Sequence, residues 1–136
     1  MGLVRVLEES SVSRSGKHKR RALFKVVDSE CRPLKYEVIS EKRVKPLYSR
    51  GSASIKEVKV PDNAFVIALE LCLNPRKHVK GIVKVYDPGG SLLAEAVYRK
   101  LKVRFKIISN EALVDIVRCV FRSLRLPVKK YAILRK

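Results

Sequence analysis

The sequence predicts one α+β domain, in which a single C-terminal amphipathic helix packs on a twisted antiparallel sheet. Alternating or short apolar segments recur over most of the chain, as is typical of strands, and only one segment near the C-terminus repeats at helical spacing. With 136 residues, of which 46% are apolar, the chain can bury a core and differs in composition from a disordered basic tail. No internal repeat or domain boundary is found, so residues 1–136 are expected to form one domain.

The first half of the chain predicts four strands and two basic loops. The strands are expected at residues 3–7, 23–27, 34–39 and 55–60. Residues 10–21 and 42–54 are expected to be loops, because they combine Lys and Arg with Ser, Gly or Pro.

The second half gives clearer strand signals. Residues 64–73 form a mostly apolar run that fits a strand buried on both faces, although its Leu-rich end also fits a helix. Residues 79–86 and 91–99 flank the turn sequence Asp87-Pro88-Gly89-Gly90 and are expected to form a hairpin. Residues 102–107 alternate cationic and apolar side chains, so one face of this strand is predicted to be apolar and the other cationic.

One helix is predicted to begin after Ser109 or Asn110, either of which can cap it, and to end before Pro127. Acidic residues lie in its early turns and arginines in its later turns, which suits the helix dipole. Its apolar stripe is predicted to comprise Leu113, Ile116, Val117, Val120, Phe121 and Leu124. The tail, residues 128–136, is expected to add an edge strand or to pair with another subunit, so a homodimer is one expectation.

The charge balance is the strongest indication of function. The chain has 31 Lys and Arg against 13 Asp and Glu, a formal net charge of +18. Like charge at this density opposes the compact state, and a soluble protein that carries it usually meets a polyanion. Nucleic acid is the commonest polyanion, and neutralising its phosphates drives binding through counterion release. A nucleic-acid partner is therefore predicted.

Composition also indicates the cellular setting. The chain has no Gln and no Thr and three Asn, and this scarcity beside many Lys, Arg and Glu is typical of hyperthermophile proteins. The N-terminus lacks the apolar core of a signal peptide, and no apolar run is long enough to span a membrane. A cytoplasmic protein without a membrane partner is expected.

The cysteines and histidines predict neither a disulfide framework nor a metal site. Cys31, Cys72 and Cys119 are odd in number and widely spaced, and the last two sit in apolar runs that suggest core positions. His18 and His78 each lie in a basic stretch that disfavours a metal cation. No phosphate-loop motif occurs, and no cofactor is expected.

Three groups of residues are predicted to contact nucleic acid. The first loop offers a flexible basic arm, with solvated connection as the alternative; its candidates are Arg14, Lys17, Lys19, Arg20 and Arg21. In the second loop a tyrosine among cations can stack a base, or can instead lie over the core rim; the candidates are Lys42, Arg43, Lys45, Tyr48 and Arg50. The third group is a cationic sheet face with interleaved aromatics, or an ordinary solvated face; the candidates are Lys80, Lys84, Tyr86, Tyr98, Arg99, Lys102, Arg104 and Lys106.

A nuclease is the weaker alternative. Asp28 after a strand, followed by Glu57-Val58-Lys59 on another, superficially resembles the carboxylate and Glu-x-Lys pattern of metal-dependent nucleases, although such spacing is common in a Lys-rich chain. The sequence thus favours a non-catalytic protein that binds single-stranded DNA or RNA. A structural RNA-binding subunit of a ribosome or ribonucleoprotein is the main rival. Exposed tyrosines favour the former, whereas buried tyrosines with long flexible arms favour the latter.

Strands followed by one helix are also the element order of some single-strand-binding families. In that order the chain resembles Whirly proteins, and in composition it resembles the archaeal ThermoDBP group. The resemblance rests on element order and composition, without matched residues, and it implies single-stranded DNA as the ligand.

Overall fold

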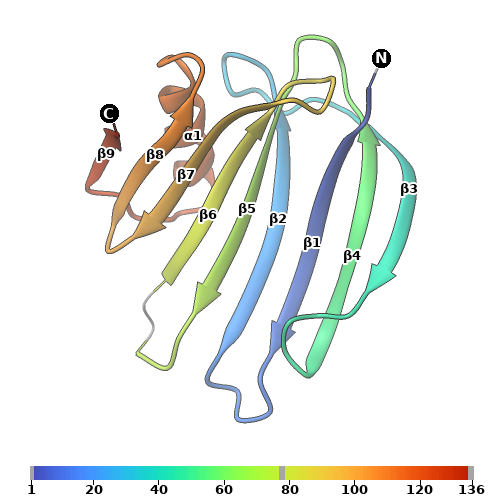
Figure 1. Ribbon diagram of the computed structural model, residues 1–136, viewed down its shortest axis with the longest axis vertical. Coiled ribbons are helices and arrows are strands. Elements are labelled where there is room, and N and C mark those ends of the chain that lie inside the picture. Colours follow the sequence, from blue (N-terminus) through green and yellow to red (C-terminus); the bar gives the residue numbers. More distant parts are fainter. Residues whose placement is uncertain (1, 77–78, 135–136) are drawn as a thin grey trace.

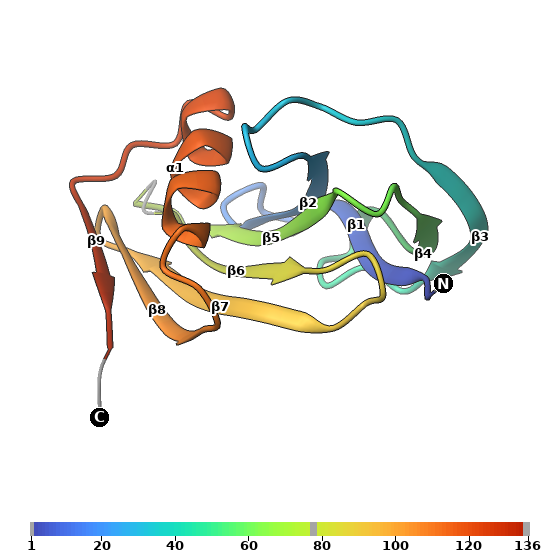
Figure 2. The same cartoon turned by 90° about the horizontal axis from the view of Figure 1, so that it is seen from above.

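Nine strands form a single sheet, and one helix lies against part of one face (Figures 1 and 2). The computed structural model describes residues 2–76 and 79–134. In chain order the elements are β1 (Val4–Val12), β2 (Lys19–Val27), β3 (Glu37–Val44), β4 (Arg50–Lys59), β5 (Phe65–Leu73), β6 (Val79–Tyr86), β7 (Leu92–Arg99), β8 (Lys102–Ile108), α1 (Leu113–Ser123) and β9 (Lys130–Ile133). The prediction of a sheet packed by one helix is confirmed, with a ninth strand after the helix.

The strands are arranged in the order β3-β4-β1-β2-β5-β6-β7-β8-β9, and all neighbours are antiparallel except β8 and β9. Because the direction reverses at each successive strand up to β8, the connections β1–β2, β3–β4, β5–β6 and β7–β8 lie at one end of the sheet. The connections β2–β3, β4–β5, β6–β7 and β8–α1 lie at the other end (Figure 1). The tail forms β9, which pairs with β8 at the edge of the sheet, so the prediction that it adds an edge strand is confirmed.

The main core lies between α1 and strands β5 to β8. The predicted stripe is buried at Leu113, Ile116, Val117, Val120 and Phe121, while Leu124 is half-buried. Small Ala94 and Ala96 of β7 let the helix approach the sheet, and larger side chains from the neighbouring strands surround them. A second cluster packs between β1, β2, β4 and β5; it comprises Val4, Val6, Phe24, Val26, Val58, Val60, Ala64 and Val66.

Much of the two predicted loops is strand. β1 continues to Val12 and β2 begins at Lys19, so the turn that replaces the expected arm at 10–21 is residues 13–18. Likewise the loop expected at 42–54 shrinks to residues 45–49, and the strand expected at 34–39 is displaced to Glu37–Val44. The reason is pairing: Ser10 lies opposite Arg21 and also opposite Ser52, so the sheet ladder holds polar residues that look like loop in isolation.

The alternation predicted for residues 102–107 holds only as far as Phe105. Val103 and Phe105 are buried beneath α1, but a bulge follows, and Ile107 pairs with Glu95 on the opposite face. Ile107 is consequently 50% exposed. An extra residue in one strand reverses the face of every later side chain, and a period-two pattern read without its partner strand cannot reveal it.

A disulfide joins Cys31 to Cys119, which corrects the expectation that the cysteines are unlinked. The β2–β3 connection passes beside α1, and the two Cα atoms lie 6.4 Å apart although 88 positions separate them in the chain. Their proximity depends on the tertiary fold, which spacing in the sequence does not report. Cys72 is free and half-buried. In the described part of the chain, no helix has the length and apolar character needed to cross a bilayer.

Replacing Cys31 with Ser is expected to lower the free energy of unfolding by about 2 to 5 kcal/mol, because the bond closes a long loop in the unfolded chain. Urea denaturation of the variant, and of the wild type with and without reductant, measures the change. The matched control is Cys72→Ser, which removes a thiol without cutting a cross-link. Equal stability of the two variants would contradict a stabilising disulfide.

Hydrogen bonds to Asp28 hold the start of the β2–β3 connection, and they make the stability of the fold depend on acid pH. Its carboxylate accepts hydrogen bonds from the backbone N–H groups of Arg32 and Glu30, each at 2.9 Å, and from the Arg32 side chain. The backbone bond from Arg32 is the main cause that holds the pKa of Asp28 below its ordinary value. The associated stabilisation is therefore present above the unfolded pKa of about 3.9 and is lost as the pH falls below it.

Asp28→Asn should be less stable than wild type at neutral pH and should lose less stability than wild type on acidification below about pH 4. Urea denaturation at several pH values tests this difference. Asp62→Asn serves as the control, since Asp62 is exposed in the β4–β5 connection. Parallel pH curves for wild type and Asp28→Asn would rule out the proposed linkage.

Candidate nucleic-acid interface

The two ends of the sheet differ sharply in charge. At one end, residues 13–18, 45–49, 74–76, 100–101 and 124–129 contain no Asp or Glu and several Lys and Arg. At the other end the connections carry Asp28, Glu30, Asp62, Asp87 and Glu111. We call the first the basic end; its exposed cations include Arg14, Lys17, Lys19, Lys45, Arg50, Arg76, Lys80, Arg99, Lys100, Lys102 and Lys130.

The side chains that accept hydrogen bonds within the turns also differ between the two ends. At the acidic end, Asp87 accepts hydrogen bonds from the backbone N–H groups of Gly89 and Ser91, both at 2.9 Å, as Asp28 does in its own turn. At the basic end the equivalent acceptors are neutral: Ser13 Oγ accepts from His18 N and Asn74 Oδ1 from Arg76 N. Both kinds of side chain stabilise a turn, but only the neutral kind leaves the positive field of the basic end undiminished.

A cationic row crosses the sheet on the side opposite α1. Lys80 lies opposite Arg99, Arg99 opposite Lys102, and Lys102 opposite Lys130. Directly opposed residues share a face, and their sequence neighbours Tyr98 and Val103 are buried under α1, so the first three of these side chains lie on the uncovered side. At about 4.8 Å per strand, the row from Lys80 to Lys130 spans about 14 Å. We call it the cationic row.

Apolar side chains lie next to this row on the same face. Ile82 pairs with Val97, two residues along the strands from the Lys80–Arg99 pair and so on the same face, and Ile82 is 42% exposed. Ile107 lies farther along the same face. The open face of β6 to β8 thus combines cations at the basic end with exposed aliphatic surface beyond them.

The β7–β8 turn presents a cation at the tip of the basic end. Lys100 and Leu101 have φ of 51° and 64°, the left-handed conformation that two-residue hairpins require and that Asn-Gly usually fills. For side chains with a Cβ this conformation costs about 1 to 2 kcal/mol each. The Leu101 carbonyl accepts a hydrogen bond from Lys129 N at 2.7 Å, which links the turn to the start of β9.

A buried acid fixes the β3–β4 loop. Glu9 is 7% exposed, and its Oε2 accepts hydrogen bonds from Ser11 Oγ at 2.7 Å and from Leu47 N at 2.9 Å. Arg20 lies 3.9 Å from the other oxygen of Glu9 and also binds Glu70. The loop therefore folds over the β1–β2 turn, where the Tyr48 and His18 rings lie 6.1 Å apart.

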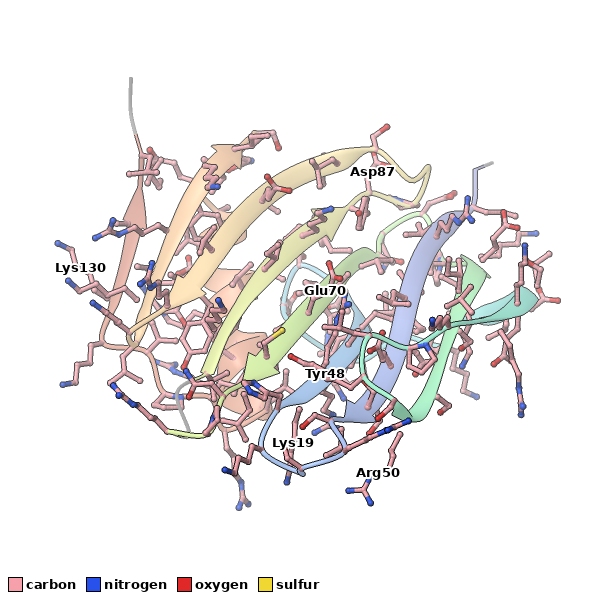
Figure 3. The ribbon with its side chains drawn as sticks, turned by 60° about the horizontal axis from the view of Figure 1, so that its bottom comes forward. Lys19, Tyr48, Arg50, Glu70, Asp87 and Lys130 are labelled. Atoms are coloured by element: carbon pink, nitrogen blue, oxygen red, sulfur yellow. A yellow bond between two sulfur atoms is a disulfide. The ribbon has the colours of Figure 1, made fainter. Side chains whose placement is uncertain are left out.

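The structure brings many of the predicted residues together. Figure 3 shows Lys19, Tyr48 and Arg50 gathered at the basic end, Lys130 at the β9 edge, and Asp87 at the far end. The predicted residues that lie at this end with exposed or half-exposed side chains are Arg14, Lys17, Lys19, Lys45, Tyr48, Arg50, Lys80, Arg99 and Lys102. Lys42 and Arg43 are exposed on the edge strand β3, and Arg104 is exposed next to the cationic row.

Other predicted residues have different surroundings. Tyr98 is 1% exposed, packs edge-on against Phe121 and donates from its hydroxyl to the Pro127 carbonyl, so its ring cannot stack a base in this structure. Arg20 is held by two carboxylates. Lys84 faces Glu95, and Tyr86 packs on the second core cluster. Lys106 is the extra residue in the bulge of β8, and the side chain of Arg21 lies on the same face of the sheet as α1.

Sequence reasoning missed Arg76, Lys100 and Lys130. Each was overlooked because it belongs to a different connection or strand, and only the alternation of strand direction brings these segments to one end. A signal was nevertheless present: odd-numbered connections of a predicted antiparallel meander share an end, and their summed charge could have been compared with that of the even-numbered ones.

The nuclease residues are engaged elsewhere. Both Asp28 oxygens accept hydrogen bonds within their turn, and Glu57 accepts one from Ser40 Oγ at 2.9 Å. Among the described residues, no three His, Cys, Asp or Glu side chains are grouped so that they could hold a metal ion. His78 lies outside the described residues.

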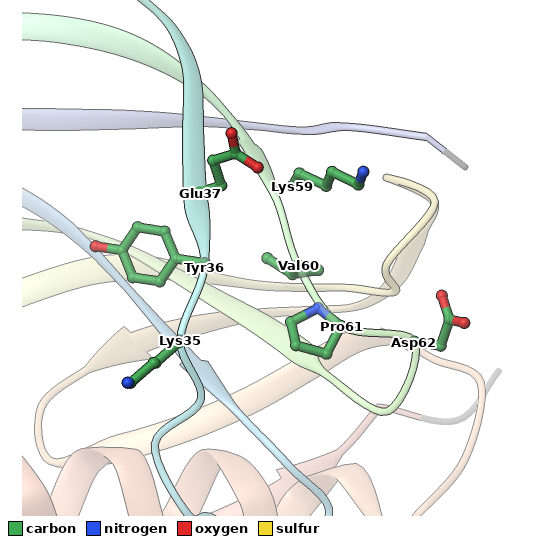
Figure 4. Close-up of a pocket in the computed structure, with 7 residues that line it drawn as sticks. All are labelled: Lys35, Tyr36, Glu37, Lys59, Val60, Pro61 and Asp62. Carbon is green, nitrogen blue, oxygen red and sulfur yellow. The ribbon is translucent and has the colours of Figure 1, made fainter.

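A pocket at the acidic end is electrostatically balanced (Figure 4). It has a volume of about 370 Å³ and lies between the start of β3 and the end of β4. Its lining contains two cations, Lys35 and Lys59, and two acids, Glu37 and Asp62, so it offers no net charge to a polyanion. The candidate interface is therefore at the other end of the sheet.

No protein-family model, curated protein or solved structure matches this chain. The resemblance to Whirly and ThermoDBP proteins accordingly gains no support from these comparisons.

Replacing Glu9 with Leu is expected to destabilise the protein by about 2 to 3 kcal/mol, since two donors lose a buried acceptor. It should also speed hydrogen exchange at the Leu47 amide, because the loop loses its anchor. Glu95→Leu is the control: Glu95 makes only a 3.9 Å, partly exposed pair with Lys84, worth less than about 1 kcal/mol. Unchanged exchange at Leu47 would show that Glu9 does not hold the loop.

Proposed function

We propose that this protein binds nucleic acid without catalysis, using the basic end and the cationic row, and that its preferred ligand is a single strand. The observation that carries the proposal is the segregation of charge: cations from separate connections converge on one end, where the sequence of the connections contains no acid. A positive charge that had no binding role would not need to be concentrated at one end of the sheet. A field concentrated at one end attracts and orients a polyanion.

The cationic row supports phosphate contacts in particular. Lys80, Arg99 and Lys102 are exposed and occupy directly opposed positions on successive strands. Lys80, Arg99 and Lys102 take part in none of the ion pairs among the described residues, so no paired carboxylate neutralises their charges. A strand laid across β6 to β9 could contact one cation after another with its phosphates.

The preference for single strands rests on the exposed aliphatic surface beside the row. A duplex presents phosphates outward and keeps its bases stacked inside, so it would leave Ile82 and Ile107 in water. An unpaired strand can place bases on these side chains while its phosphates meet the cations. Tyr48, half-exposed at the basic end, can add one stacking contact.

The disulfide bears on the cellular setting. Disulfides are rare in cytosolic proteins, but intracellular proteins of hyperthermophiles are an exception. We keep the cytoplasmic location as part of the proposal, on the ground that the composition and the Cys31–Cys119 bond together suit a hyperthermophile.

Changing Lys80, Arg99 and Lys102 to Gln together should weaken binding of single-stranded DNA at least about tenfold and reduce the slope of log affinity against log salt by about 2. Fluorescence anisotropy at several salt concentrations measures both. The matched control changes Lys25, Lys35 and Lys59 to Gln, which removes the same charge from exposed positions away from the row. The control should lose much less of the slope.

The same titration compares single-stranded DNA, duplex DNA and single-stranded RNA with Mg²⁺ present. Tighter binding of single strands, with the strand intact, is the expected result. Equal losses in the row variant and the control would reduce the interaction to overall charge. A clear preference for structured RNA would favour the ribonucleoprotein subunit, and Mg²⁺-dependent cleavage would favour the nuclease.

A further inference from the structure

A cationic groove lies between α1 and β9. The two elements lie at the same edge of the sheet (Figure 2), next to the end of the cationic row at Lys130. Its volume is about 430 Å³. The walls are formed by the later part of α1, the connection after it and the start of β9; the lining residues are Arg118, Arg122, Leu126, Val128, Lys129, Lys130 and Tyr131. We call it the α1–β9 groove.

Four of these seven lining residues are cations and none is an acid. The acid in contact with them is Asp115, whose Oδ1 lies 3.6 Å from Arg118 Nη1. Asp115 is highly exposed, and an exposed pair of this kind contributes little energy, so it does not cancel the field of the groove. Arg122 and Lys129 are exposed, and neither takes part in an ion pair among the described residues.

The groove also has a rigid floor. Tyr131 packs against the main core, and the Arg118 guanidinium lies over its ring, 4.9 Å from the centroid. This stacking holds Arg118 in place while leaving its N–H groups able to donate. A carbonyl-rich helix end would repel an anion, but the carbonyls of Val120, Phe121 and Arg122 accept hydrogen bonds from Leu124, Leu126 and Arg125 respectively.

The groove continues the cationic row. Lys130 lines it and also lies opposite Lys102, while the backbone N–H of Lys129 donates to the Leu101 carbonyl in the β7–β8 turn. A chain of cations thus runs from Lys80 across the open face and around the β9 edge to Arg122.

We propose that the α1–β9 groove binds a backbone phosphate of a nucleic-acid strand that leaves the open face and turns around the β9 edge. The proposal rests on the proposed function and extends it, because it assigns a second phosphate contact area to longer ligands. Short strands are held by the cationic row alone, and longer ones reach the groove as well. Arg118, Arg122 and Lys129 supply the charge, and the phenol of Tyr131 supplies a neutral donor.

The test compares deoxythymidine oligomers of about 6 and about 20 nucleotides; the shorter lies near the low end of the footprints of about 4 to 16 nucleotides seen in small single-strand binders, and the longer exceeds them. The variant changes Arg122 and Lys129 to Gln; both are exposed, so the fold should be kept. The control changes Lys25 and Lys35 to Gln and removes the same charge elsewhere. The long oligomer should bind the groove variant several-fold more weakly, with a salt slope lower by about 1.4, while the short oligomer should be unaffected relative to the control.

Three results would overturn the inference. If the groove variant and the control behave alike toward the long oligomer, the groove makes no phosphate contact. If the groove variant loses as much affinity for the short oligomer as for the long one, the groove is not an extension of the row. If the wild type binds neither oligomer, the proposed function fails and this inference fails with it, an outcome that is distinct from the first two because it needs no variant.

Discussion

Antiparallel pairing is the constraint on which the rest of this structure depends. Each reversal of strand direction sends successive connections to opposite ends of the sheet, so the chain can sort its charges by placing cations in one set of connections and acids in the other. Regular sheet hydrogen bonds place Lys80, Arg99 and Lys102 side by side on three successive strands. The basic end is thus a consequence of topology combined with turn composition, and no single segment carries it.

Concentrating like charge opposes folding, and the stabilising features lie where they do not dilute that charge. The helix stripe packs on the middle of β5 to β8, and the disulfide fastens the β2–β3 connection to α1. Close to the basic end the chain keeps one deeply buried acid, Glu9, which is enclosed by Arg20, Ser11 and the Leu47 amide and is only 7% exposed. Such an acid fixes a loop from within, and the Arg20 guanidinium beside it offsets its negative charge.

Periodicity and turn residues in the sequence predicted the elements that depend on local interactions. The helix, its stripe, the hairpin around Asp87 and the strand at Val103 and Phe105 all follow from periodicity and turn chemistry, and the structure confirms them. The predictions were wrong where contacts with distant segments determine the structure. Ser10 to Val12 are strand because β2 and β4 pair with them. Ile107 changes face at a bulge, and Cys31 bonds to Cys119 because the tertiary fold brings them together. The candidate site was likewise found in pieces, since its segments converge only once the strand order is known.

The placement of the aromatic side chains decides how selective such an interface can be. Phe24, Tyr98, Phe105 and Phe121 are buried, and Tyr36, which is 47% exposed, lies at the acidic end. The open face therefore offers cations and aliphatic side chains rather than a series of stacking rings. Phosphate contacts are indifferent to sequence, and aliphatic contact discriminates weakly among bases. Binding through this face would then be governed by strand length and salt concentration far more than by base identity.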